Sequence, residues 1–241
     1  MANRRRKEDK RQMKILLIED DREIREMLHT YLMTENFEVV CAADGEKACE
    51  YFNTDSYSII LLDLMIPKIT GMDVMKYIRQ KSTVPIIIIS AKDSDSDKTL
   101  GLGLGADDYI TKPFSLTEVM ARIKANIRRN TEYAAIHPER TKLSWGTLTM
   151  NLENHTLTKS GEIIDLTAKE FDILRLLLEN PKRVYTKAQI YSQIWNDAYM
   201  GDENAVNVHI SRLRTKIEHD PRKPQIVITV WGIGYKLGEQ K

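Results

Sequence analysis

The chain has 241 residues, longer than one ordinary domain, which favours two separate hydrophobic cores. Charged side chains make up 29% of the residues, yet they nearly cancel to a formal net charge of +1. The two halves of the chain nevertheless differ in net charge, because residues 13–130 are acidic overall and residues 141–241 are mildly basic. Different partners are therefore expected for the two halves.

Several classes of protein are excluded by the residues that the sequence contains. The two cysteines, Cys41 and Cys49, fit neither a metal site nor a disulfide framework, so a reducing compartment is expected. The apolar runs are too short to span a membrane, and the N-terminus has charge without the hydrophobic core of a signal peptide. We expect a soluble cytoplasmic protein. Its basic first segment, residues 1–12, is expected to be disordered, with a weak, sequence-independent affinity for phosphate as the one function that its charge suggests.

The first strand is predicted at residues 14–18, and three consecutive acids follow it, Glu19, Asp20 and Asp21. Adjacent carboxylates repel one another unless a cation neutralises them, so a metal ion is the economical explanation. The alternative is that acids gather at a helix N-terminus because the helix dipole favours them there. Asp21 can lead the next helix in this way, which leaves Glu19 and Asp20 for the ion.

Buried strands and amphipathic helices alternate through the rest of the first half. Runs of four aliphatic residues, at 59–62 and 86–89, are typical of strands buried on both faces of a parallel sheet. Five strands and five helices in this order predict a doubly wound α/β domain over residues 13–130, with right-handed crossovers. The strands are predicted near 14–18, 37–41, 59–62, 85–89 and 106–110, and the later helices near 45–53, 71–81, 94–104 and 116–129.

Asp63 follows the central apolar run, at the edge where open parallel sheets bind their ligands. Taken alone, an aspartate at this position is more often a simple cap of the next turn. Here the same edge also gathers Glu19, Asp20, Ser90 and Lys112. Three carboxylates can hold Mg²⁺ with a main-chain carbonyl and waters. A carboxylate beside Mg²⁺ and an ammonium can attack a phosphoryl group, because both cations neutralise the transferring oxygens.

Together these motifs resemble the receiver domain of two-component response regulators. By that resemblance Asp63 is the phosphoacceptor, and Lys112 and Ser90 hold the phosphoryl oxygens. Tyr109 is then the aromatic switch that reports them. The implied Mg²⁺ ligands are Glu19, Asp20, Asp63 and the main-chain carbonyl of Met65. The matching stretches are the acid pair Glu19-Asp20, residues 61–67, Ser90-Ala91-Lys92 and residues 105–114.

The resemblance also implies a symmetric dimer face on the fourth helix, fifth strand and fifth helix of the receiver. A solvated helix surface is the alternative for such charges, because exposed ion pairs contribute only about 0–1 kcal/mol each. The charges at the matching positions are Asp107, Asp108, Glu118, Arg122 and Lys124.

The second half begins after a linker, residues 131–141, which shows no sustained periodicity and contains His137-Pro138. Short alternating runs between residues 142 and 166 predict a small antiparallel sheet. Thr167 and Glu170 then form the pattern of a capping box at the start of a helix. Thr186 caps a second helix, and the loop 196–202 leads to a third.

The third helix, predicted over residues 203–218, combines a buried stripe with an outward face suited to DNA. The stripe runs from Val206 to Ile217 at helical spacing. In a major groove Arg reads guanine, Asn reads adenine, and an apolar side chain meets the thymine methyl group. An ordinary solvated surface is the alternative. The candidate DNA contacts are Asn204, Asn207, Val208, His209, Ser211, Arg212, Arg214 and Thr215.

Two strands, near residues 225–230 and 235–237, predict a hairpin directly after this helix. Three helices, a preceding sheet and this hairpin resemble the winged-helix DNA-binding domain of the OmpR/PhoB response regulators, a smaller α+β domain over residues 142–241. The matching stretches are 166–171, 206–214 and 232–235. One departure is Trp231, because many relatives have an arginine there that suits the minor groove. Trp231 is a further candidate contact, expected to pack on a sugar or against the domain itself.

The two resemblances cover nearly the whole chain after residue 12 and imply a phosphorylation-controlled DNA-binding regulator of transcription. A sensor histidine kinase would phosphorylate Asp63, the receivers would form a homodimer, and two winged helices would bind adjacent half-sites of promoter DNA. RNA polymerase would be a further partner through loop 196–202. No enzyme activity beyond slow self-dephosphorylation is expected. Two alternatives remain, a metal-dependent phosphatase and a receiver that acts only as a phosphate-independent dimerisation module.

Overall fold

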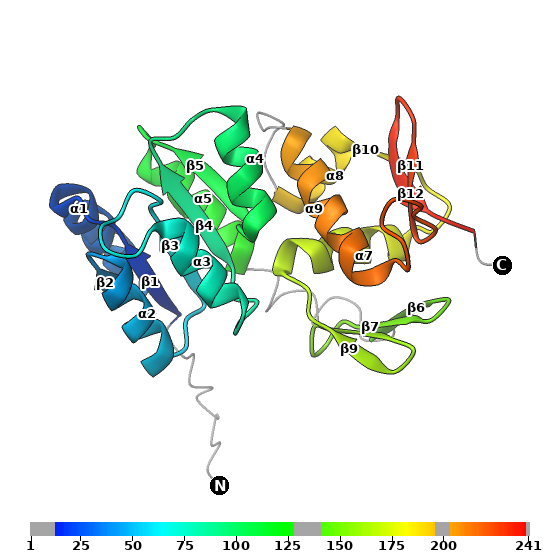
Figure 1. The fold of residues 1–241 in the computed structure, drawn as a ribbon, viewed down its shortest axis with the longest axis horizontal. Helices are drawn as coiled ribbons and strands as arrows, with labels where there is room; N and C mark the ends of the chain where they lie inside the picture. The colour runs from blue at the N-terminus through cyan, green and yellow to red at the C-terminus, as the bar shows by residue number, and fades with distance from the viewer. Residues whose placement is uncertain (1–12, 128–140, 196–202, 240–241) are drawn as a thin grey trace, which may run out of the picture.

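The computed structural model describes residues 13–127, 141–195 and 203–239, which fold into two domains (Figure 1). The first domain is a five-stranded sheet between helices, and the second combines three helices with two small sheets. Segment 1–12, nearly all of the linker 131–141 and the loop 196–202 lie outside the described residues. Within the described ranges no helix is long and apolar enough to cross a membrane.

The five strands of the first domain run parallel in the order β2-β1-β3-β4-β5. The prediction of a doubly wound parallel sheet is confirmed, because the chain moves outward from β1 in both directions. All five carboxyl ends therefore lie at one edge of the sheet. The bounds are β1 Lys14–Ile18, β2 Glu38–Ala42, β3 Ile59–Leu62, β4 Ile86–Ser90 and β5 Asp108–Thr111.

Helices cover both faces of this sheet, because successive strand residues point to opposite sides. In β3, Ile59 and Leu61 join a buried cluster with α1 and α5, whereas Ile60 and Leu62 join another with α2, α3 and α4. Burying each of these side chains stabilises the fold by about 1.5–3 kcal/mol, so the strand ends are firmly held. The bounds are α1 Arg22–Thr34, α2 Gly45–Thr54, α3 Gly71–Arg79, α4 Asp95–Leu104 and α5 Leu116–Ile127.

The second domain has an antiparallel sheet, β6-β7-β8-β9, followed by the helices α7, α8 and α9. Its other sheet, β10-β12-β11, contains the predicted hairpin and a two-residue strand that was not predicted from the sequence. Gly234 permits that pairing, because a Cβ there would lie 1.9 Å from the Tyr185 carbonyl oxygen. The bounds are β6 Lys142–Trp145, β7 Leu148–Asn151, β8 Thr156–Lys159, β9 Glu162–Ile164, α7 Ala168–Glu179, β10 Tyr185–Thr186, α8 Lys187–Trp195, α9 Glu203–Ile217, β11 Val227–Val230 and β12 Gly234–Leu237.

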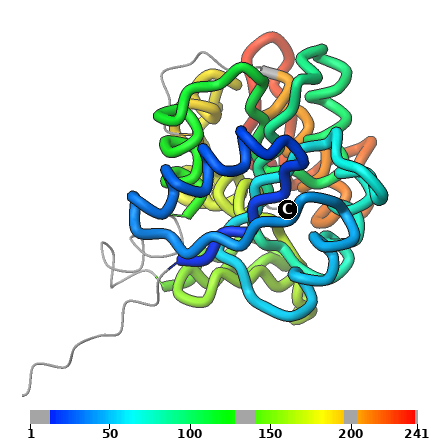
Figure 2. The backbone as a smooth tube through the Cα atoms, turned by 90° about the vertical axis from the view of Figure 1, so that its left-hand side faces the viewer, coloured from blue at the N-terminus to red at the C-terminus, as the bar shows by residue number. Residues whose placement is uncertain are grey.

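The two domains pack directly against each other. Helix α9 lies against α4 (Figure 1), and α8 lies against α5. One buried apolar cluster extends through both domains and includes Leu102 and Ala106 of the first with Val206 and Ile210 of α9. Figure 2 views the first domain from its outer side, with the second domain behind it. The helix predicted to read DNA is therefore also part of the domain interface.

Candidate functional site

Three carboxylates meet at the carboxyl edge of the five-stranded sheet. Glu19 and Asp20 follow β1, and Asp63 follows the neighbouring strand β3. Oxygen atoms of the three side chains lie within 4.8 Å of one another. Glu19 is 1% exposed and Asp63 is 4% exposed, whereas Asp20 faces solvent. Carboxylates this close and this buried repel one another unless positive charge is supplied.

Lys112 supplies one positive charge to this cluster. Its Nζ lies 2.5 Å from Asp63 Oδ2 and 2.8–2.9 Å from the two carboxylate oxygens of Glu19. Burial alone would lower the pKa of Lys112, but hydrogen bonds to Asp63 and Glu19 outweigh it and hold that pKa above its usual value. The Lys112 main-chain N–H also donates to the Ser90 carbonyl oxygen at 2.9 Å. The structure thus brings Lys112 together with the three predicted acids.

The donor atoms fit a divalent cation of the Mg²⁺ type. Burial raises the pKa of Glu19, Lys112 opposes that rise, and the charge of Asp63 adds to it. One ammonium against three carboxylates leaves net negative charge, and hard oxygen donors are the ligands that Mg²⁺ prefers. Asp63 Oδ1 accepts a hydrogen bond from the Met65 N–H at 2.9 Å, which orders the loop containing the predicted carbonyl ligand.

Arg25 orders the acidic loop, although it is not among the residues predicted for this site. Its Nη1 donates to the carbonyl oxygens of Glu19 at 2.7 Å and Asp20 at 2.9 Å. Two hydrogen bonds from one charged donor fix the main chain of both predicted metal ligands. Asp21 caps α1 as predicted, accepting from Glu23 N and Ile24 N. The sequence feature that indicates this role is the position of Arg25, one helical turn after the cap at Asp21.

Ser90 and Tyr109 lie on the neighbouring strands β4 and β5. Ser90 is fully buried at the end of its strand. Tyr109 is partly buried, and its hydroxyl donates to the Lys92 carbonyl oxygen at 2.8 Å. Burial raises the pKa of Tyr109 to about 12, so this hydroxyl remains a hydrogen-bond donor at neutral pH. A Cβ on Gly101 would lie 3.2 Å from Tyr109 Cε2, which places the ring directly against α4.

The five charges predicted for a dimer face do not share one face. Asp107 is fully buried, and its carboxylate lies 2.7 Å from the Arg79 guanidinium of α3. The structure therefore removes Asp107 from that face, because adjacent residues of an extended segment point to opposite sides. The other four pair within the same domain, Asp108 with Arg122 at 2.9 Å, Glu118 with Arg122 at 3.2 Å, and Lys124 with Glu35 at 2.8 Å.

Two of the predicted DNA contacts have other surroundings in α9. His209 is fully buried, with its ring centroid 5.4 Å from that of Trp195. It is three residues after Val206 and four before Leu213, so it belongs to the buried stripe rather than to the outward face. Arg214 is bound to the hairpin, because its guanidinium donates to the Val227 carbonyl oxygen at 2.6 and 2.9 Å.

The remaining DNA candidates differ in exposure. Arg212 is held against the receiver, where its Nη1 donates to the carbonyl oxygens of Leu102 at 3.1 Å and Ala106 at 3.3 Å. Ser211 and Thr215 are exposed, while Asn204 and Val208 are partly buried. Asn207 Oδ1 accepts a hydrogen bond from the Tyr235 hydroxyl at 2.8 Å, which joins α9 to the hairpin. Trp231 is 90% exposed at the hairpin turn, so it does not pack against its own domain.

Glu170 has a second role that the capping-box pattern did not reveal. As predicted, its Oε2 accepts from the Thr167 N–H at 3.0 Å at the start of α7. The same carboxylate, fully buried, also lies 2.7 Å from Lys216 Nζ and 3.1 Å from Arg212 Nη2, both of α9. Glu170 therefore fixes the orientation of the outward face of α9.

Comparisons with known proteins agree with this architecture. Residues 15–124 match the family "Response regulator receiver domain", and residues 161–237 match "Transcriptional regulatory protein, C terminal". The chain is 52% identical over 225 residues to the uncharacterized transcriptional regulatory protein YcbL of Bacillus subtilis, covering 93% of this chain and 100% of YcbL. It is 42% identical over 223 residues to the sensory transduction protein RegX3 of Mycolicibacterium smegmatis, covering 92% and 98%.

A solved structure extends this likeness to the arrangement of the whole chain. A mutant of RitR is 27% identical to this protein and superimposes with a TM-score of 0.74. That superposition covers 95% of this chain and 100% of the RitR chain. The protein therefore belongs to the OmpR/PhoB family of response regulators, in which a receiver domain is joined to a winged-helix DNA-binding domain that regulates transcription.

Proposed function

We propose that Asp63 accepts a phosphoryl group from a sensor histidine kinase and that this modification controls DNA binding. The observation that carries the proposal is the Lys112 ammonium, which lies 2.5 Å from Asp63 and 2.8 Å from Glu19. A carboxylate oxygen of Asp63 attacks phosphorus, and the new O–P bond forms as the N–P bond to the kinase histidine breaks. The imidazole leaves with the electron pair and takes up a proton.

The side chains around Asp63 have separate roles in this transfer. Glu19, Asp20 and Asp63, with the main-chain carbonyl of Met65, would hold Mg²⁺, which supplies positive charge to the transferring oxygens when bound. Lys112 donates to one phosphoryl oxygen and Ser90 to another. Because Lys112 and Ser90 are already in place, they stabilise the negative charge on the phosphoryl oxygens without rearrangement of the site.

Phosphorylation is proposed to act on DNA binding through pairing of the receivers. Tyr109 lies between the site and α4, so a phosphoryl group bound by Ser90 would change the surroundings of its ring. Pairing would place two winged helices on half-sites about one helical turn apart. A preference of a few kcal/mol for the pairing-competent state is sufficient for control. The proposed DNA contacts are Asn204, Asn207, Val208, Ser211, Arg212, Thr215 and Trp231.

The direct test is intact-protein mass spectrometry after incubation with acetyl phosphate and Mg²⁺, followed by size-exclusion chromatography. Wild type is expected to gain the mass of one phosphoryl group and to dimerise, whereas Asp63→Asn gains neither mass nor partner. Asp73→Asn, which alters an exposed aspartate of α3, is the matched control and is expected to behave as wild type. An adduct on Asp63→Asn would contradict the assignment. Dimers of Asp63→Asn without any adduct would support the phosphate-independent module.

A further inference from the structure

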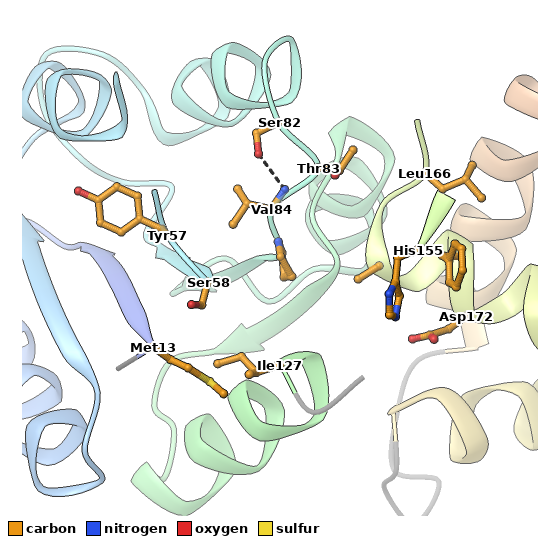
Figure 3. Close-up of a pocket in the computed structure, with 13 residues that line it drawn as sticks. Met13, Tyr57, Ser58, Ser82, Thr83, Val84, Ile127, His155, Leu166 and Asp172 are labelled. Carbon is orange, nitrogen blue, oxygen red and sulfur yellow. Dashed lines mark hydrogen bonds between the residues drawn. The ribbon is translucent and has the colours of Figure 1, made fainter. Parts of the chain in front are cut away.

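The hairpin of the winged-helix domain, residues 227–237, lies at the end of that domain away from the receiver (Figure 1). A cavity of about 530 Å³ lies between the two domains, and His155, Leu166 and Asp172 line it on the winged-helix side (Figure 3). The residues that line this cavity include none from the hairpin. Within its own domain β12 pairs with β10 and packs against α7, whereas β11 forms the outer edge of the sheet. The position of the hairpin therefore depends on contacts inside the winged-helix domain.

Glu218, the residue directly after α9, binds the main chain at the start of β11. Its carboxylate accepts from the N–H groups of Gln225 at 3.0 Å, Ile226 at 2.9 and 3.1 Å, and Val227 at 2.9 Å. Successive N–H groups of a regular strand point to opposite sides, so three that converge on one carboxylate fix a bend in the chain. Glu218 is buried, and hydrogen bonds to a charged acceptor are stronger than those to a neutral one. Glu218 therefore determines where β11 begins relative to α9.

Arg214, one helical turn before Glu218, binds the same strand. Its guanidinium donates to the Val227 carbonyl oxygen and, at 2.8 Å, to Thr229 Oγ1. Glu218 accepts from the N–H of Val227 and Arg214 donates to its carbonyl oxygen, so the end of α9 binds both main-chain groups of this residue. A further strand would bind these groups in a larger sheet, so protection of the exposed edge is one role for the pair. The pair also fixes the distance between β11 and α9.

A third side-chain contact joins α9 to the hairpin closer to its tip. The Tyr235 hydroxyl donates to Asn207 Oδ1, and Tyr235 lies opposite Thr229 in the pairing of β11 with β12. Asn207 is close to two helical turns before Arg214, so both side chains lie on one face of α9. Residues 230–234, which include the 90% exposed Trp231, extend beyond these contacts. The tip of the hairpin is therefore placed by side chains of α9 and of the residue that follows it.

We propose that Glu218 is a positioning residue for DNA binding. By holding the start of β11 it sets the distance between α9 and Trp231, the two parts of the domain that contact DNA in the proposed function, on which this inference rests. A DNA duplex presents its grooves at a fixed separation, so two elements that bind it together must keep a matching distance. Because Glu218 holds the hairpin at that distance before DNA arrives, less ordering is required on binding.

The test is a double-mutant cycle on DNA affinity in the full-length, unphosphorylated protein. The probe is a duplex that wild type selects from a random-sequence pool. Glu218→Gln keeps the size of the side chain but replaces one acceptor oxygen with an amide donor, which cannot bind the N–H groups of residues 225–227. Trp231→Ala removes the exposed indole and leaves the contacts with α9 in place. Each single variant is expected to bind about tenfold more weakly than wild type, and the double variant no more weakly than Trp231→Ala.

Asp220→Asn is the matched control, because it alters an exposed carboxylate close to Glu218, and it should bind DNA as wild type does. A role in stability alone would weaken binding equally with and without the Trp231 indole, and equal losses would overturn the proposal. Amide hydrogen exchange at residues 225–227 should be faster in Glu218→Gln, and unchanged exchange there would also overturn it. If wild type binds no duplex, the DNA contacts of the proposed function fail and this proposal fails with them. Failure of Asp63 to accept a phosphoryl group would leave the cycle unaffected, because the protein is unphosphorylated throughout.

Discussion

Lowering the pH is expected to weaken the packing of α9 through His209. This side chain is fully buried beside Trp195, and the Asp107 main chain and Arg79 of the receiver lie near it. Burial lowers the pKa of His209 well below its usual value, and the nearby cations Arg212 and Lys169 lower it further. The Asp107 main chain opposes this effect, while Arg79 adds to it. The folded protein therefore keeps the ring neutral at a pH where the unfolded chain already binds a proton.

The sign and size of this effect follow from proton linkage. When folding lowers the pKa of a base, the unfolded chain binds a proton that the folded protein does not bind. The free energy of unfolding therefore keeps its full value above the unfolded pKa and decreases as the pH falls below it. The unfolded pKa of histidine is about 6.5. If the folded ring stays neutral, His209 alone removes about 2 kcal/mol of the free energy of unfolding between about pH 7 and pH 5.

The assay is urea unfolding at both pH values, followed by tryptophan fluorescence in wild type and His209→Gln. For each protein the assay gives the loss of unfolding free energy between the two pH values. These losses are then compared between wild type and His209→Gln, because the carboxylates contribute equally to both. His209→Gln is expected to lose about 2 kcal/mol less than wild type on acidification. His219→Gln alters an exposed histidine of the same domain and should match wild type. Equal losses in wild type and His209→Gln would refute the reasoning.

Three further predictions concern the receiver site and the hairpin. Lys112→Ala should lower the free energy of unfolding by about 3 kcal/mol, because Glu19 and Asp63 lose their buried counter-charge. Added Mg²⁺ should restore part of this loss, and unchanged thermal stability would contradict the prediction. Arg25→Ala should weaken Mg²⁺ binding about tenfold by calorimetry, whereas Arg22→Ala on the exposed side of α1 should not. Trp231→Arg should raise DNA affinity and steepen the slope of log K against log salt by about 0.9, and an unchanged slope would place the hairpin away from the DNA backbone.

The receiver fold could be predicted from sequence because its signals are local and repeated. Aliphatic runs such as Ile59–Leu62 specify strands buried on both faces, and the order of strands and helices then restricts the topology. The predicted fifth strand began two residues early, since the Ala106 N–H still bonds to Gly101 and closes α4. The strand β10 had no local signal, because its two residues are identified only by pairing with β12, far along the chain.

The candidate site was predictable where it depends on strand ends and unpredictable where it depends on domain packing. Glu19, Asp63 and Lys112 converge because parallel strands end at one edge. The inward direction of Asp107 was available from strand alternation, which prevents Asp107 and Asp108 from sharing a face. The partners of Arg212 had no such signal, because two main-chain carbonyls in another domain leave no pattern of side chains.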